Sequence, residues 1–247
     1  MKHMLTTLLI ASSITCFSQP LQIKPSRNAA ERKWMRSEQY EMEWYMLNNG
    51  NKNMLGTVTT NVTIQKNQLY LVTNVALKQM PDKWIDTSIA NANTLAPVYH
   101  ASYNNQRDMA LHFNDNVTGY YHDKTKSQYN IVNETSAVSF FDSNLYPYLL
   151  RFLSFKENYT AAIPIFDYNP NGVMGVVHAY ITNVTTSTIE HKQLGRRTVW
   201  AVTVTDELND SNTSSSIYYI DQQDRTLWKQ EITAGKRKML MTRKEVL

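Results

Sequence analysis

The sequence predicts a mainly β protein, built as a curved antiparallel meander or open barrel with one short internal helix. Runs of residues that alternate between apolar and polar recur from about residue 40 onward, and short polar turns separate them. The composition, with 15 Tyr and 5 Trp but only 7 Gly, favours an ordered sheet over a flexible polar chain. A single segment, residues 141–155, has its apolar residues at helical spacing instead.

Residues 1–18 have the pattern of a secretory signal peptide. Lys2 gives a basic start, and residues 4–17 carry no charge and are rich in apolar side chains. A membrane-spanning helix needs about 20 apolar residues, and this run is shorter. We expect cleavage after Ser18, which leaves a mature chain that begins at Gln19 and has no transmembrane span.

Cys16 is the only cysteine of the 247 residues. Cleavage after Ser18 removes it, so the mature chain then has neither disulfides nor a cysteine nucleophile. In the alternative, lipoprotein processing, Cys16 becomes the acylated first residue; that processing usually follows a Leu three positions earlier, where this chain has Ser13. Acylation stays open. A cysteine-free exported chain of this size points to the periplasm or the outer membrane of a Gram-negative bacterium.

We divide the mature chain into a lead-in segment, residues 19–38, with a short helix possible from Asn28, and a single β-rich domain, residues 39–247. The clearest strand patterns cover residues 40–47, 55–66, 68–79, 107–113 and 117–123, and further strands follow residue 197. Lys66 and Asn67 read as a tight hairpin turn. A second turn at residues 114–116 would place His122 opposite Asp108.

Residues 145–153 predict a helix of two to three turns whose apolar face packs against the sheet. Asp142, Ser143 or Asn144 can cap its start. If Asn144 is the cap, Pro147 lies in the first turn, where its missing N–H costs nothing.

No arrangement of residues in the sequence predicts an enzyme, a metal site or a cofactor. The histidines show no H-x-H or H-E-x-x-H spacing, and a zinc site needs three or four converging ligands. A glycine-flanked serine elbow and a glycine-rich phosphate loop are both missing. Glu41 and Glu43 share one face of a strand, which we interpret as its solvent side.

The charge is mildly positive, with 25 basic residues against 21 acidic ones and a net charge of +4. The basic residues are spread along the chain, apart from Arg196-Arg197 and the last dozen residues. A nucleic-acid-binding protein concentrates more positive charge on one element, so we expect no nucleic-acid partner.

Three stretches together resemble an exported bacterial family known as domain of unknown function 3108: TLAPVYHASYNNQRDMALHF, DSNLYPYLLRFLSFKENYTAAIPIFD and YYIDQQDRTLWKQEI. The family pattern is a strand ending in Leu-x-Pro, then an Asp-led helix ending near an Arg, then paired C-terminal strands. Here those positions are Leu95-Ala96-Pro97, Asp142 and Arg151, and the resemblance runs from about Tyr40 to Met241.

The resemblance implies a curved antiparallel sheet or open barrel that holds a helix, in the periplasm or at the outer membrane. Such an architecture is similar to the half-barrels that carry lipids and lipoproteins between membranes. The family has no established reaction, so the resemblance supplies no catalytic residues.

These observations predict a noncatalytic binding or carrier module for an apolar ligand, a lipid or a lipoprotein. The helix would act as a lid over the sheet. The predicted ligand-site residues are Leu145, Tyr148, Leu149 and Phe152 of the helix and Leu69, Leu71, Met109, Leu111 and Phe113 of the sheet.

The alternative function is a structural or assembly component of the outer envelope that contacts a protein partner through a strand edge or an aromatic surface. The space between the helix and the sheet separates the two functions. An open apolar void of about 300 Å³ or more would favour the carrier, and a filled core would favour the assembly role.

Overall fold

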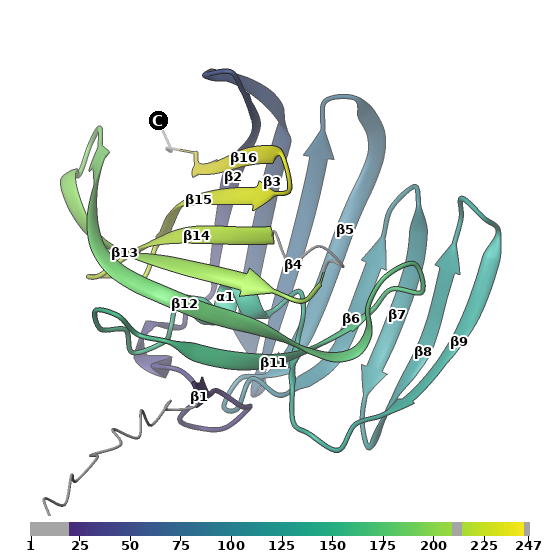
Figure 1. Cartoon of the computed structure of the whole chain (residues 1–247). Helices are drawn as coiled ribbons and strands as arrows, with labels where there is room; N and C mark the ends of the chain where they lie inside the picture. Colours follow the sequence, from purple (N-terminus) through teal and green to yellow (C-terminus); the bar gives the residue numbers. More distant parts are fainter. Residues whose placement is uncertain (1–19, 209–213, 245–247) are drawn as a thin grey trace, which may run out of the picture.

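The computed structural model describes residues 20–208 and 214–244, apart from the side chains of residues 81–83. The predicted leader and its cleavage site lie outside the described residues. One 16-stranded sheet coils around a short helix (Figure 1), which confirms the predicted fold class.

The first half of the sheet is an antiparallel meander in which each strand pairs with the next. Its strands are β2 (Glu38–Asn48), β3 (Asn51–Gln65), β4 (Gln68–Leu77), β5 (Met80–Asn91), β6 (Pro97–Tyr103), β7 (Arg107–Phe113), β8 (Asn116–Asp123) and β9 (Gln128–Thr135).

The second half is another antiparallel meander, which crosses in front of the first in Figure 1. Its strands are β11 (Ala161–Tyr168), β12 (Met174–His191), β13 (Gly195–Asp206), β14 (Ser214–Asp221), β15 (Leu227–Ala234) and β16 (Arg237–Arg243). The last strand, β16, pairs antiparallel with β2, so the two meanders form one continuous sheet.

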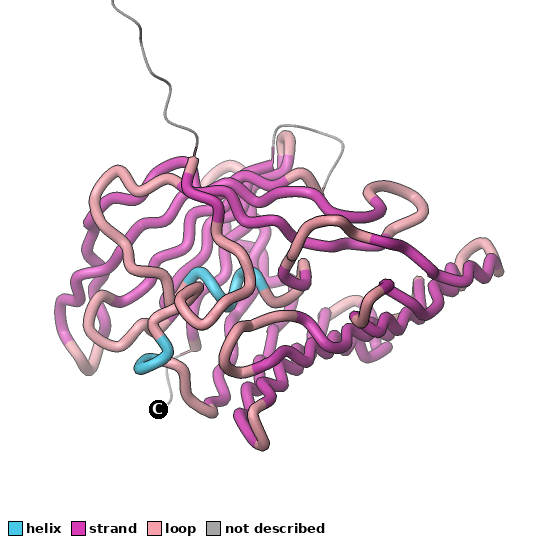
Figure 2. The backbone as a smooth tube through the Cα atoms, turned by 90° about the horizontal axis from the view of Figure 1, so that it is seen from below, coloured by secondary structure: helices cyan, strands magenta, loops and turns pink. Residues whose placement is uncertain are grey.

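The two ends of the sheet do not pair with each other, so the barrel stays open. At one end β11 carries two short parallel strands, β1 (Leu21–Gln22) and β10 (Phe141–Asp142). At the other end the order stops at β9. Side chains bridge the two ends instead, because Phe166 and Tyr168 of β11 share a buried cluster with residues of β7, β8 and β9. Figure 2 shows the resulting half-barrel from below, with its helices lying inside the coil of strands or at its lower rim.

The predicted alternation is clearest in β4. Leu69, Leu71 and Val75 lie on the inner face and are at most 7% exposed. The hairpin before this strand is confirmed, since Gln65 pairs with Gln68 and both turn residues take positive φ, 47° at Lys66 and 64° at Asn67. Positive φ at both central positions is typical of a two-residue hairpin turn that matches the twist of the strands.

The predicted register of the β7–β8 hairpin is also confirmed, because Asp108 pairs with His122. The carboxylate of Asp108 accepts from Lys124 Nζ at 2.7 Å. Gly119 fills a tight position in β8, where an added Cβ would lie 2.0 Å from the carbonyl oxygen of Ala110. Glycine therefore lets the two strands approach closely.

The internal helix α1 (Tyr146–Leu150) is shorter than the two to three turns predicted. The N-cap position is Leu145, and no side chain caps the helix. The carboxylate of Asp142, three residues earlier, binds Ser88, His100 and the backbone N–H of Asn144. After the helix the backbone continues in tight i→i−3 turns, such as Phe152 N–H to the Leu149 carbonyl at 3.0 Å. In the lead-in segment, the helix expected from Asn28 is a single 3₁₀ turn, η1 (Arg32–Trp34).

Candidate functional site

The nine predicted ligand-site residues all lie in the packed interior, with exposed fractions of 0–8%. They fall into two core clusters. The helix residues share the larger cluster with the two leucines of β4, whereas Met109, Leu111 and Phe113 belong to the smaller cluster around β7–β9. The structure therefore brings the helix to β4 but not to β7.

The space between α1 and the sheet is nearly filled. A cavity of about 140 Å³ remains beside the helix, and Leu71 and Tyr148 are the two predicted residues that line it. Ligand pockets usually measure about 300–1,000 Å³. The Tyr148 hydroxyl is buried without a hydrogen-bond partner in the described part of the chain, and burial raises the pKa of Tyr148. The helix thus forms part of the core, so this space by itself favours the assembly role, and a carrier would need a different cleft. Binding by these nine residues stays a prediction.

A larger cleft of about 420 Å³ opens on the inner face of β4 and β5. Two loops form its walls, residues 104–106 between β6 and β7 and residues 169–171 between β11 and β12. We call this the concave cleft; its volume lies in the range of ligand pockets. Its lining residues are Val75, Leu77, Met80, Trp84, Asn104, Asn105, Gln106, Arg107, Tyr121, Asn169 and Asn171.

One side of the concave cleft is apolar. Val75 pairs with Trp84 and Leu77 pairs with Met80, so these residues lie on neighbouring strands. Leu77 and Trp84 are partly buried and pack against the larger core cluster. The indole Nε1 of Trp84 is buried and has no hydrogen-bond partner within residues 20–208 and 214–244. A buried donor without a partner is a group that a bound molecule can satisfy.

The opposite walls are polar. Arg107 is oriented by its neighbour Ser102, whose hydroxyl oxygen accepts from Arg107 Nε at 3.1 Å. On the other loop Asn171 donates to Asp123 at 3.0 Å, which ties this wall to the β8–β9 turn. Hydrogen bonds from Thr125 and Asn171 lower the pKa of Asp123 to about 2, so the carboxylate stays charged and the tie persists at neutral pH.

A buried polar network lies beside the start of α1. Asp142 accepts a hydrogen bond from the Ser88 hydroxyl, and its other carboxylate oxygen lies 2.6 Å from His100 Nδ1. Asn144 donates to the same Ser88 hydroxyl at 2.9 Å and also lines the 140 Å³ cavity. Ser88, His100 and Asp142 are at most 5% exposed, so nearly all of this network is shielded from solvent.

The three residue types are those of a serine hydrolase, but the arrangement differs. Ser88 donates to Asp142 rather than to His100, so no imidazole can take the proton of the hydroxyl. Burial alone would lower the pKa of His100, but the nearby carboxylates of Asp142, Asp86 and Asp167 outweigh it and raise that pKa. The network therefore serves as a charged hydrogen-bond anchor between α1 and strands β5 and β6.

Sequence reasoning missed this network because its members are distant in sequence. Asp142 was one of three residues that could cap the helix, and His100 shows no metal-ligand spacing. The pairing register of β5 and β6 could have indicated the network, because Ser88 and His100 are directly opposite each other on these strands. That pairing becomes visible only once both strands are placed.

A second buried charge joins the end of α1 to β2. Arg151 is 1% exposed, forms an ion pair with Glu38 and donates from Nε to the Arg225 carbonyl at 2.7 Å. Its guanidinium lies 5.3–5.5 Å from the ring centres of Tyr40, Tyr148 and Phe152. These contacts satisfy the buried cation, and they make Arg151 a structural residue.

Within the described residues, no three or more His, Cys, Asp or Glu side chains gather in a way that could hold a metal ion. The helices of the same residues are all too short or too polar to cross a membrane.

No curated protein matches the sequence. The family model described as protein of unknown function DUF3108 matches residues 39–242, which include all of β3–β15 and most of β2 and β16. The match confirms the resemblance carried by the Leu95-x-Pro97, Asp142 and Arg151 positions. The chain therefore belongs to the DUF3108 family.

Proposed function

We propose that this protein is a noncatalytic binding or carrier module of the cell envelope that holds an amphiphilic molecule, a lipid or a lipid-modified protein, in the concave cleft. The observation that carries the proposal is a cleft of about 420 Å³ with one apolar and one polar side. The export that residues 1–18 predict supports the proposal, because lipids and lipid-modified proteins occur in the cell envelope.

The division of the cleft supports an amphiphile over a purely apolar ligand. Val75, Leu77, Met80 and Trp84 offer a surface for an acyl chain, and burying each CH₂ group contributes about 0.8 kcal/mol. The amide side chains and Arg107 on the facing loops offer donors and acceptors for a polar head.

The chemistry of the lining supports binding rather than catalysis. Among the side chains that the structure describes, which leave out those of residues 81–83, Arg107 and Tyr121 are the titratable groups that line the cleft. Neither type of side chain ordinarily titrates near neutral pH, whereas general acid–base catalysis requires a group with a pKa close to the working pH.

A fluorescent fatty-acid probe tests the proposal. We expect the purified protein to bind the probe and Met80→Glu to weaken binding at least tenfold, because the variant places a carboxylate against the acyl chain. Met174→Glu is the matched control, since Met174 is 55% exposed and does not line the cleft. Equal affinity of the two variants would remove the cleft from the proposal.

Native mass spectrometry of protein purified from its own envelope identifies the ligand. A co-purifying lipid or acylated peptide that is lost in Met80→Glu supports the carrier function. A ligand-free protein that also fails to bind the probe would contradict it.

A further inference from the structure

The strand β9 (Gln128–Thr135) forms a long free edge of the sheet. It pairs with β8 on one side and has no strand partner on the other within the described residues. The opposite end of the sheet differs, because β1 and β10 both pair with β11 there. The fold therefore covers one end of its sheet and leaves the other end open.

Apart from one charged residue, Glu134, the free edge lacks the features that usually prevent strands from pairing between molecules. Natural edge strands are protected by short length, by Pro, by Lys or by bulges. The sequence of β9, QYNIVNET, spans eight residues and contains no Pro, Gly, Lys or Arg, and its pairing with β8 is regular throughout. Such an edge is competent to accept another strand.

The outer face of this edge is apolar and exposed. Ile131 is 74% exposed and Tyr129 is 57% exposed, whereas Val132 on the inner face is 1% exposed. The ring of Tyr129 stacks on Tyr120 of β8 at 5.4 Å between ring centres. The aromatic surface thus continues from the edge onto the sheet, next to backbone groups that pair with none of the described strands.

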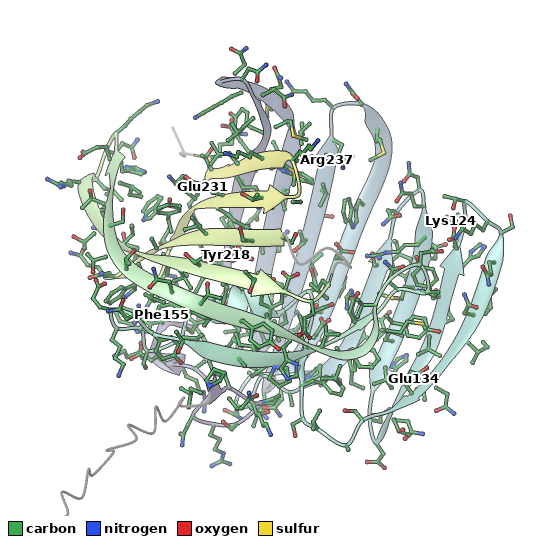
Figure 3. All side chains as sticks on the ribbon, in the orientation of Figure 1. Lys124, Glu134, Phe155, Tyr218, Glu231 and Arg237 are labelled. Atoms are coloured by element: carbon green, nitrogen blue, oxygen red, sulfur yellow. The ribbon has the colours of Figure 1, made fainter. Side chains whose placement is uncertain are left out.

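The charges near β9 have opposite signs at its two ends. Exposed Lys124, which also forms an ion pair with Asp108, and exposed Lys126 precede the strand. Exposed Glu134 lies near its end and pairs with Val117 of β8. Figure 3 shows Lys124 and Glu134 at opposite ends of this part of the sheet. Two such edges complement each other only when they run antiparallel.

We propose that β9 pairs antiparallel with β9 of a second copy of this chain, about a two-fold axis at Ile131. In this register Ile131 faces its own equivalent, and Tyr129 faces Asn133. Gln128 faces Glu134, so no like charges lie directly opposite each other. The basic end of each strand lies beside the acidic end of the other. Because the axis is two-fold, this contact forms twice, once at each end of the strand pair.

A second copy fits this edge better than an unrelated strand, because one sequence supplies both the exposed isoleucine and the charge pattern that complements it. Pairing through one strand per copy forms a small interface. We therefore expect an equilibrium between monomer and dimer that depends on concentration. The inference is independent of the ligand proposed for the concave cleft.

Sedimentation velocity across a range of protein concentrations tests the proposal. We expect the purified protein to form dimers as its concentration rises and Ile131→Lys to stay monomeric, because two lysines would face each other at the axis. The control is Leu194→Lys, at a residue that is 55% exposed in the β12–β13 turn, and it should dimerise like the wild type.

Disulfide trapping in a Cys16→Ser background tests the register. Residues opposite each other in antiparallel strands have Cα atoms about 4.5–5.5 Å apart, which suits a disulfide. Ile131→Cys should therefore give a covalent dimer on mild oxidation, whereas Leu194→Cys should not. A wild type that is monomeric at every concentration, or an Ile131→Lys variant that dimerises normally, would overturn the proposal, as would a strand of another protein found on β9.

Discussion

At the scale of single residues, Asp142 is the central residue of the buried polar network beside α1. A buried carboxylate is tolerated only when its charge is paired and hydrogen bonded, and here Ser88 and His100 supply both partners. As a result the residue fastens the segment before α1 to the sheet, and it also accepts the backbone N–H of Asn144 at 3.3 Å.

His100 makes stability depend on pH. Because the carboxylates raise the pKa of His100 in the folded state, the folded protein binds a proton that the unfolded chain releases near its ordinary pKa of about 6.5. The stabilisation is complete below about pH 6.5 and is lost as the pH rises through the raised pKa. We expect the urea midpoint to fall as the pH rises above about 6.5.

The variant His100→Gln should abolish most of that pH dependence, along with some stability at low pH. His112→Gln is the control, because His112 is exposed on the outer face of β7. A pH slope that is unchanged in His100→Gln would show that other groups cause it.

At the scale of elements, the close approach of β7 and β8 depends on Gly119. This residue has φ of 152°, and an added Cβ would meet the Ala110 carbonyl at 2.0 Å. We expect Gly119→Ala to lower the free energy of unfolding by about 3 kcal/mol, because the two strands must move apart or the backbone must strain. Denaturant unfolding measures the loss.

Gly50→Ala is the control that measures only the cost of placing alanine at a positive φ, without a clash of its Cβ. Gly50 also has a positive φ, 81°, but nothing lies within 4 Å of an added Cβ. Its loss should stay near 1–2 kcal/mol, the usual penalty of a left-handed residue. Equal losses for the two variants would mean that strand contact at Gly119 is unimportant.

A strand or helix could be predicted where its own residues show a pattern, such as alternation of apolar and polar side chains or a turn motif. The alternation in β4 marks its inner face correctly, and the turns before β4 and β8 fix their register. By contrast, β11 has no predicted counterpart, because seven of its eight residues are buried and a strand buried on both faces shows no alternation. The predicted length of α1 was wrong, because after Leu150 the backbone continues in i→i−3 turns instead of α-helical bonds.

At the scale of the whole molecule, the pairing of β16 with β2 holds the two meanders together. Six residue pairs from Lys238 to Arg243 join the last strand to the first long one. Residues of both meanders and of α1 share the larger core cluster. The sheet and its core therefore have no boundary at which one half can separate from the other.

We expect thermal unfolding in a single cooperative transition, with coincident loss of far-ultraviolet and near-ultraviolet circular dichroism. Deleting residues 237–247 should unfold the first meander as well as the second, because β2 loses its partner and the shared core opens. Two separate transitions in the intact protein would contradict this, and so would a folded first meander in the truncated chain.

The sequence alone determined which residues face inward, because alternation along a strand is a local property of the backbone. All nine residues chosen for the ligand site are indeed buried. The sequence could not show whether an inward-facing residue belongs to the core or lines a cleft, because that depends on which side chains pack opposite the residue. The coiling of the sheet decided both. It packed α1 against β4, left Trp84 and Met80 beside an open space, and left one edge of β9 without a partner among the described strands.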